Sequence, residues 1–584
     1  MKTLSFQSKH KILSLALIAA LATPVAHAAT ITADPTAVDE AVQTDGKCSL
    51  REAVLSVNTG ANVGDCVADV TQAYGTNDTI LLPAGTYNLT VTGLDESWTG
   101  VNPDFTVVNT PDATKGDLDI MKSVNIVGAG MDTTIIQWDA SVADADRDRI
   151  FHAYTTASAT VNVSIAGVTI TGGRTMEEFI ADGPDDPASP TVVNTKFYLR
   201  RAGGGIAVGP GANVVQIDPG LTGSENSAGR GGSLKPGESD PGGATFSLSL
   251  SHMKVTANQA QGDGAGLYTA SPMDATNIVI SDNISTTNGG GIYDEGDTSM
   301  QNSTISGNKA EGGGGIFMTG STTVNFAGTT FSGNRAIGGG AISSRSGVTT
   351  NMINSTISGN LADDVGAGFY SNGPGNLAFV TIANNIASAD SPAAGVGINL
   401  FPSGAVNVTV KDVLLDANKK GWDPVAEPNG PADPSLLASA NCGYTGGASG
   451  SLVSGGYNLS SDDSCTTDLN DTTDINNVDP MIGALADNGG PTRTHALLAG
   501  SPALGKGNAI AGVTVDQRGI TRDATPDIGA YEVPTPPVVP SSSGGGGGCS
   551  FNPNASFDPT LLVLLGIAIG GLFIRRRSNN SSQQ

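Results

Sequence analysis

The heptapeptide NSTISGN occupies residues 302–308 and, letter for letter, residues 354–360. Each copy ends in a four-residue unit that recurs along the chain, in which an apolar residue stands three positions before an asparagine. Six such units end 25 or 26 residues apart, at Asn258, Asn283, Asn308, Asn334, Asn360 and Asn385. A glycine-rich unit such as GGGIY (289–293) stands between them. A near-fixed period of this length predicts a stacked solenoid.

The pattern inside the period predicts which solenoid forms. Short alternating stretches such as NSTIS are typical of strands and not of helices. About 25 residues fit one coil of a parallel β-helix, with Ile305 and Ile357 pointing inward. We expect each repeated asparagine to occupy a left-handed or bridging corner and its amide to bond to the asparagine one coil away. The two heptapeptides then lie two coils apart, as structural corners and not as a duplicated catalytic element.

The repeats resemble those of the polymorphic outer-membrane proteins, whose passenger domains form right-handed β-helices. This resemblance implies an all-β chain with a single right-handed parallel β-helix. Upstream, strand-and-glycine stretches such as TILLPAGTYNLTV (79–91) extend the pattern, so we place the β-helix at residues 78–430. Residues 175–245, rich in Pro, Gly and Asp, are expected to form long loops inserted between coils.

An open solenoid end needs a cap. Residues 29–77 contain CSLREAVLSVN (48–58), in which Ser49 and Glu52 predict a helix that begins with a capping box. Further coils and a second cap region are expected at residues 431–532. In an oxidising compartment two local disulfides are expected, and the pairs are Cys48 with Cys66 and Cys442 with Cys465.

The CSLREA string resembles the motif that names a family of exported bacterial β-helix proteins. LADNGGPTRTHALLAGSPALGKG (485–507) and DQRGITRDATPDIGAYE (516–532) carry the same resemblance. It spans nearly the whole mature chain and implies an architecture and export. It implies no established reaction.

Residues 1–28 read as a secretory signal: lysines, an apolar run and the cleavage pattern Ala26-His27-Ala28 follow one another. A retained N-terminal membrane anchor is the alternative, but the apolar run is short for a span. Export would place the protein at the surface or outer envelope of a bacterium.

The C-terminus joins a Pro/Ser/Gly linker (533–548) to a tail (549–584). The tail holds Cys549, an apolar helix segment (561–574) and three arginines, a layout that resembles the CTERM family of bacterial sorting tails. The resemblance implies a membrane contact through 561–574 and a processing protease, with Cys549 as a processing or lipidation site. An uncut tail anchor is the alternative.

The formal net charge of −26 disfavours nucleic acid as a partner. Candidate catalytic acids are the pairs Asp185-Asp186 and Asp363-Asp364, but the Gly-His-Gly and Arg-x-Lys elements of polygalacturonase-like sites are absent. The mature chain has three histidines, His152, His252 and His495, and His152 and His252 are expected to be packed or at the surface.

A lyase site would need acids and a base on one face. Asp144, Asp146 and Asp148 alternate, and we expect them on one face of a strand with Arg147 and Arg149 on the other. That arrangement argues against a lyase. Residues 468–479 (DLNDTTDINNVD) hold Asp and Asn oxygens that suit Ca²⁺, without EF-hand spacing; no other cofactor is expected.

The sequence therefore predicts a non-catalytic, surface-displayed protein that acts in adhesion or another envelope interaction. Its ligand would be a surface glycan or protein bound through the loops at 175–245. The alternative is a polysaccharide-acting lyase or hydrolase on the same scaffold. No catalytic, cofactor-binding or metal residue is assigned.

Overall fold

The computed structural model describes residues 28–534, with gaps at 41, 70–72, 94–111, 156–157, 177, 183–194, 202, 210–212, 220–233, 237–243, 389–394, 402–406 and 446–449. Contacts divide the chain into Met1–Pro534 and Thr535–Gln584. The predicted signal, Asp185-Asp186, most of the linker and the whole tail, with Cys549 and 561–574, lie outside the described residues. Within the described part, no helix is long and apolar enough to cross a membrane.

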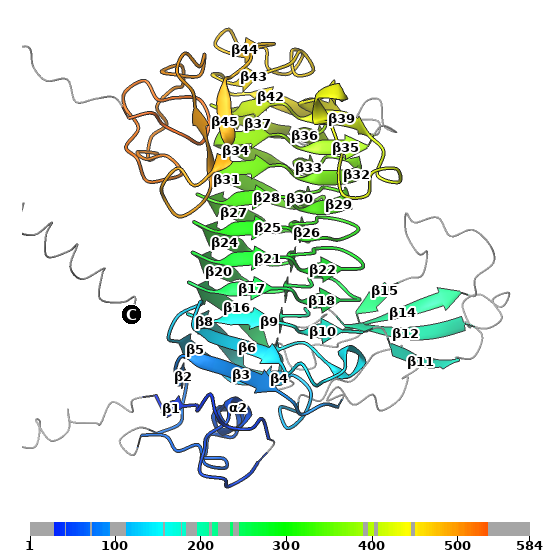
Figure 1. Ribbon diagram of the computed structural model, residues 1–584, viewed down its shortest axis with the longest axis vertical. Coiled ribbons are helices and arrows are strands. Elements are labelled where there is room, and N and C mark those ends of the chain that lie inside the picture. The colour runs from blue at the N-terminus through cyan, green and yellow to red at the C-terminus, as the bar shows by residue number, and fades with distance from the viewer. Residues whose placement is uncertain are drawn as a thin grey trace, which may run out of the picture. The chain divides into compact units, whose positions relative to one another are not determined.

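The described chain winds into a right-handed parallel β-helix whose coils stack along one axis (Figure 1). Each coil contributes strands to four faces, which we number in chain order. The first and second faces belong to one continuous sheet. Strands β31 (Thr349–Ser358) and β34 (Gly375–Ala383) run across both faces, because their residues pair with strands of each.

The other strands of the first face are β1 (Thr30–Thr32), β2 (Asp78–Leu82), β5 (Val124–Gly128), β8 (Thr160–Ala166), β16 (Thr245–Ser251), β20 (Met273–Thr276), β24 (Thr298–Gln301), β27 (Thr323–Ala327), β37 (Asn407–Lys411) and β42 (Ser451–Ser454). Those of the second face are β3 (Gly85–Leu89), β6 (Thr134–Trp138), β9 (Thr169–Thr171), β17 (Lys254–Thr256), β21 (Val279–Ser281), β25 (Thr304–Ser306), β28 (Thr330–Ser332), β38 (Leu414–Asp416), β43 (Leu459–Ser460) and β44 (Ile475–Asn476).

The third face is built from short strands: β10 (Arg174–Thr175), β18 (Gln259–Ala260), β22 (Ile284–Ser285), β29 (Arg335–Gly338), β32 (Leu361–Val365), β35 (Ile386–Ser388), β39 (Lys419–Trp422) and the antiparallel β40 (Ala438–Ser439). The fourth face is a ten-stranded parallel sheet of β4 (Leu118–Ile120), β7 (Phe151–Ala153), β13 (Ile206–Val208), β19 (Leu267–Thr269), β23 (Ile292–Asp294), β26 (Ile316–Met318), β30 (Ile342–Ser344), β33 (Phe369–Ser371), β36 (Ile398–Leu400) and β41 (Cys442–Tyr444).

Residues with positive φ turn the chain between faces. Asn302 (φ 50°) and Asn354 (φ 47°) lie at the corner between the first and second faces. At the next corner the left-handed residue comes immediately before the repeated asparagine, as Gly307 (φ 66°) does before Asn308. Of the two conformations predicted for the repeated asparagine, left-handed or bridging, the left-handed one is therefore wrong, because its neighbour makes the turn.

The repeated asparagines form a buried ladder along the second corner. Asn283 Oδ1 accepts from both the N–H and Nδ2 of Asn258, each at 3.0 Å, and Asn308 Oδ1 does the same for Asn283. The second Nδ2 hydrogen of each internal member reaches a carbonyl of the preceding coil, such as Val255 O for Asn283. The ladder runs through Asn385 and continues to two further members, Asn418 and Asn441.

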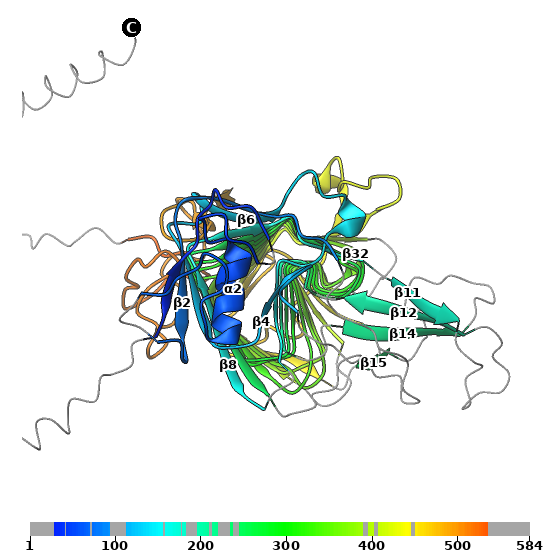
Figure 2. The same ribbon diagram turned by 90° about the horizontal axis from the view of Figure 1, so that it is seen from below.

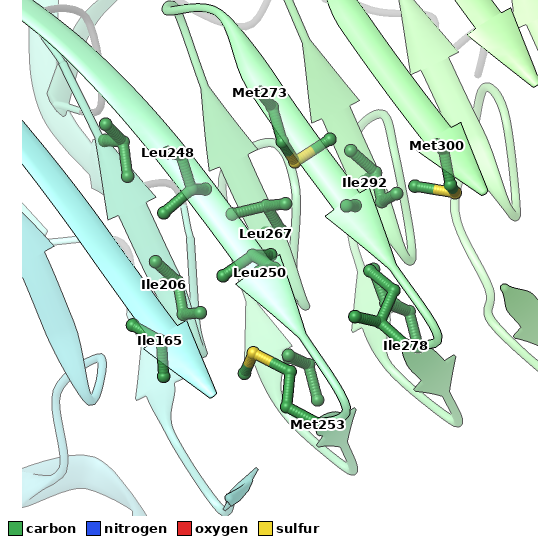
Figure 3. Close-up of a cluster of buried hydrophobic side chains, with 14 of the residues drawn as sticks. Ile165, Ile206, Leu248, Leu250, Met253, Leu267, Met273, Ile278, Ile292 and Met300 are labelled. Atoms are coloured by element: carbon green, nitrogen blue, oxygen red, sulfur yellow. The ribbon is translucent and has the colours of Figure 1, made fainter. Parts of the chain in front are cut away.

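Apolar side chains from opposite faces fill the interior. Leu248, Leu250 and Met273 from the first face meet Ile206, Leu267 and Ile292 from the fourth, as Figure 3 shows. All six are at most 2% exposed. Each buried side chain of this size contributes about 1.5–3 kcal/mol, so the stack of apolar layers supplies the main driving force for folding.

The cap and disulfides form as the sequence predicts. Helix α2 (Leu50–Thr59) begins with the Ser49–Glu52 capping box and lies across the first coils (Figure 2). Cys48 is bonded to Cys66, and Cys442 is bonded to Cys465.

Three parts of the organisation differ from expectation. The β-helix begins with β1 and not near residue 78, because β1 pairs in parallel with β2. Within 175–245 the chain forms an antiparallel sheet and one fourth-face strand, β13, as well as connections. The antiparallel sheet projects sideways from the solenoid (Figures 1 and 2); its strands are β11 (Glu178–Asp182), β12 (Thr195–Arg201), β14 (Asn213–Pro219) and β15 (Leu234–Pro236).

The third difference concerns residues 480–533. They fold back along the side of the solenoid, starting with a hairpin of β45 (Ile482–Ala486) and β46 (Thr494–Leu497). We call residues 480–533 the clasp. Figure 1 shows it in orange beside β31 and β34.

Substitution of one ladder asparagine tests how far the fold depends on the ladder. Asn334→Ala removes the partners of the Asn308 amide groups and of Ile305 O. We expect a loss of about 2–5 kcal/mol, because each unsatisfied buried group costs about 1–3 kcal/mol. Urea unfolding measures the loss. Lys309, the exposed residue directly after the ladder member Asn308, serves as the control: Lys309→Ala should change the free energy of unfolding by less than about 0.5 kcal/mol. An equal loss of stability in both variants would contradict the ladder's role.

Candidate functional site

The CSLREA residues are engaged in building the cap. Ser49 accepts from the Glu52 N–H, and the Glu52 carboxylate accepts from the Ser49 N–H. Arg51 is fully buried and donates to both carboxylate oxygens of Asp39, at 2.8 and 3.2 Å. Its remaining N–H groups reach the carbonyls of Ala113, Gly116 and Asp117. All five guanidinium donors are used, so this motif holds helix α2 on the first coils.

The second copy of NSTISGN is the place where the clasp docks. Asn354 donates from Nδ2 to Val515 O and accepts from Arg522 Nη2, both at 2.9 Å. Thr356 Oγ1 donates to Gln517 Oε1 at 2.6 Å. His495 Nε2 lies 2.8 Å from the Oγ of the next outward residue, Ser358.

The first copy presents the same side chains without a clasp. Asn302, Thr304 and Ser306 stand at the equivalent corner and outward positions. In the described part of the chain their side chains form no hydrogen bond with residues 480–533.

Neighbouring coils explain the difference. The Gln517 amide also donates to Thr330 Oγ1 at 2.8 Å, so it bridges hydroxyls of two adjacent coils. The coil before Thr304 carries Val279 at the corresponding position, which has no hydroxyl. The docking site is thus made by adjacent coils together and not by the heptapeptide alone.

The segment DQRGITRDATPDIGAYE (516–532) supplies the clasp's own buried ion pairs. Arg522 and Glu532 are 3.1 Å apart with both side chains 2% exposed, and Arg518 lies 2.7 Å from Asp516. Arg522 also lies over the Phe379 ring at 3.8 Å. Burial raises the pKa of Glu532 and lowers the pKa of Arg522. These residues fix the clasp in place.

The candidate acids that the structure describes are bound to structural partners. Asp363 forms a two-bond ion pair with Arg335, at 2.8 and 3.1 Å, and Arg335 also lies over the ring of Trp422. In residues 468–479, Asp471 caps Thr473 and Asp474 accepts from the Asn458 N–H. Within the described ranges, no group of three His, Cys, Asp or Glu side chains could hold a metal ion. The calcium prediction itself remains untested.

The expected strand of alternating acids does not form. Asp144 and Asp146 lie in a 3-10 helix, η1 (Asp144–Asp146), and Asp144 pairs with Arg147 at 3.2 Å. The acids and bases are therefore not on opposite strand faces, because the segment leaves the sheet. The other 3-10 helix is η2 (Pro434–Leu436).

A buried charged cluster on the fourth face was not foreseen. Asp119 and His152 are partners in the β4–β7 register, with Oδ1 and Nδ1 3.5 Å apart. Arg149 lies 3.1 Å from Asp117, and all four side chains are at most 1% exposed. Sequence reasoning named His152 and Arg149 but had no signal for their carboxylate partners. Such burial fits a structural role beneath the cap.

The first face carries a continuous row of short polar side chains that point outward. The strand register aligns one residue from each of eleven successive coils, and none is buried. We call this set the polar row: Thr30, Thr79, Asn125, Ser164, Ser249, Asp274, Ser299, Asn325, Asn351, Asn376 and Thr409.

Sequence reasoning missed the polar row, although the repeat contains its signal. From Ser249 to Asn376, each member stands nine residues before a ladder asparagine. The offset places it one strand earlier, at an outward position of the pleat.

The polar row forms one wall of a shallow groove of about 370 Å³. Within it, Asn351 Nδ2 donates to Asn325 Oδ1, and Asn376 Nδ2 donates to Asn351 Oδ1, both at 2.9 Å. Two positions further along the same strands lie Ala327, Ile353 and Ala378, which we call the apolar stripe. Ser299 and Gln301 close one end, and no lining side chain that the structure describes is ionisable.

Comparison with known proteins supports the fold. Residues 264–429 match the family model of the right-handed β-helix region. Among solved structures, a pectate lyase aligns over 84% of this chain and 95% of its own, with 10% identity and a TM-score of 0.40. A mannuronan C-5 epimerase A-module of Azotobacter vinelandii aligns over 72% of this chain and 98% of its own, with 13% identity and a TM-score of 0.27.

These likenesses concern the fold alone. A virus protein, ORF18 of Geobacillus virus E2, aligns over 72% of this chain and 67% of its own with a TM-score of 0.19. No curated protein matches the chain.

Titration of His495 is expected to weaken folding in acid. Burial lowers the pKa of His495, so the unfolded chain binds the proton more tightly and stability falls as pH drops below about 6.5. Asp412 has the opposite effect on stability. Burial raises its pKa to about 6, so the folded chain binds the proton more tightly and Asp412 stabilises the fold more as the pH falls. Urea midpoints between pH 7.5 and 5.5 should fall less in His495→Gln than in the unchanged protein, and more in Asp412→Asn. Parallel curves for all three proteins would contradict this assignment.

Proposed function

We propose that this protein is a non-catalytic, surface-displayed β-helix that binds envelope material along its first face. The polar row, with its groove, is the observation that carries the proposal. It offers hydrogen-bonding side chains at the spacing of the coils, about 4.8 Å, over much of the length of the solenoid. The proposal thus adds the first face to the insertion at 175–245, which the sequence favoured as the binding surface.

The chemistry of the groove supports binding over cleavage. Glycoside hydrolysis needs a pair of carboxylates beside the scissile bond. The described lining of the groove is made of hydroxyl, amide and apolar side chains. The acids Asp294 and Asp363 have structural roles instead. Asp294, whose pKa burial raises to about 7, is enclosed, and Asp363 is paired with Arg335.

Export and anchoring complete the proposal. The signal segment (1–28) would direct export, and the tail (549–584) would hold the protein at the bacterial surface. A sorting protease acting near Cys549 would replace the membrane contact of 561–574 with a permanent anchor. An uncut tail would leave the chain anchored through the same segment.

Binding and cleavage can be measured on the same material. The purified chain without signal and tail, residues 29–534, is mixed with isolated bacterial envelopes and with a panel of polysaccharides. We expect retention on the envelope fraction without release of reducing or unsaturated ends. Release of such ends, abolished by one Asp→Ala change, would contradict the proposal and favour a polysaccharide-acting enzyme.

A further inference from the structure

We infer that the groove at coils 299–378 binds a neutral, extended glycan that runs parallel to the solenoid axis. The inference rests on the proposed function and names the ligand class of the same surface.

The amide chain of the groove leaves one donor and one acceptor per coil for a ligand. Each asparagine amide has two N–H donors and an oxygen with two lone pairs. Asn351 uses one donor toward Asn325 and one lone pair toward Asn376. The remaining donor and lone pair of Asn351, which lines the groove, have no hydrogen bond to the described part of the chain. A sugar hydroxyl both donates and accepts, so it matches this pairing at each coil.

The second wall suits the other surface of a sugar ring. A pyranose carries hydroxyls at its rim and C–H groups on its faces. Ala327, Ile353 and Ala378 run parallel to the amide chain and are partly exposed. A chain of sugars lying along the axis would therefore place hydroxyls on the polar row and C–H groups on the apolar stripe. The volume of about 370 Å³ lies within the usual range for ligand sites, about 300–1,000 Å³.

Charge excludes anionic polymers from this groove. A uronate chain needs cations to pair with its carboxylates, and the described lining has none. The polar row carries one charged member, Asp274, in the coil before Ser299, and it would repel such a chain. The overall charge of −26 acts in the same direction.

The geometry also argues against an extended peptide. A peptide binds a sheet through an unpaired edge, whereas the groove lies on the face of strands that are already paired on both sides. Side chains of an extended peptide on one side repeat every about 6.6–6.8 Å, which does not match the coil spacing.

Isothermal titration of residues 29–534 with hexasaccharides tests the inference. Cellohexaose, mannohexaose and chitohexaose serve as neutral probes, and hexagalacturonate serves as the anionic probe. We expect at least one neutral probe to bind and Asn351→Leu to weaken its binding at least tenfold, because Leu keeps the volume and removes the amide. Gln259→Ala, an exposed amide on β18 of the third face, is the matched control and should change binding less than twofold.

Folding and function are separated by two further measurements. Unchanged thermal unfolding of Asn351→Leu shows that the variant is intact; if it is destabilised, Asn376→Leu at the exposed end of the amide chain replaces it. Tighter binding of hexagalacturonate, or neutral binding that the groove variants leave unchanged, would overturn the inference. Envelope retention that Asn351→Leu abolishes, with no neutral hexasaccharide bound, would overturn the glycan class and leave the proposed function standing. If the unchanged protein binds neither the envelope fraction nor any hexasaccharide, the proposed function is overturned as well.

Discussion

The asparagine ladder is the constraint on which the rest of the structure depends. An internal ladder amide such as that of Asn334 bonds three groups of the preceding coil, the Asn308 N–H, Asn308 Nδ2 and Ile305 O, and Asn360 Oδ1 of the following coil. It therefore fixes both the rotation and the rise between coils. All eight members, from Asn258 to Asn441, are fully buried, where an unmatched amide is costly. A coil that is out of register therefore loses several bonds at once. Along the coils that carry the ladder, one outward residue per coil of the first face lines up in the polar row, from Ser249 to Thr409.

The CSLREA string and the segment 516–532 act at the margins of this stack. CSLREA fixes helix α2 over the first coils through the buried Arg51–Asp39 pair. The segment 516–532 holds the clasp together through the Arg522–Glu532 pair and docks it on the second face through Gln517. A specific motif can thus have a purely structural role, because a buried ion pair requires particular side chains just as a catalytic site does. What remains accessible for a ligand is the repeat's own outward surface.

The sequence predicted the features that repeat or that act locally. The period predicted the solenoid, the Ser49–Glu52 spacing predicted the helix start, and cysteine spacing predicted both disulfides. Contacts between distant segments had no such signal. The clasp joins Gln517 to Thr330 and Thr356, and nothing in the local pattern of residues 480–533 shows that they turn back along the side. The polar row was missed for a different reason: short polar residues are ordinary in a strand, and their alignment becomes visible only with the register.

The claim that the first face is the binding surface can be tested by hydroxyl-radical footprinting of residues 29–534 with and without bound envelope material. Ile353, in the wall of the groove, should become protected, while Phe401, which is exposed beyond the fourth-face strand β36, should be oxidised to the same extent in both samples. Protection confined to Phe401 or to the insertion at 175–245, with Ile353 unchanged, would contradict the account.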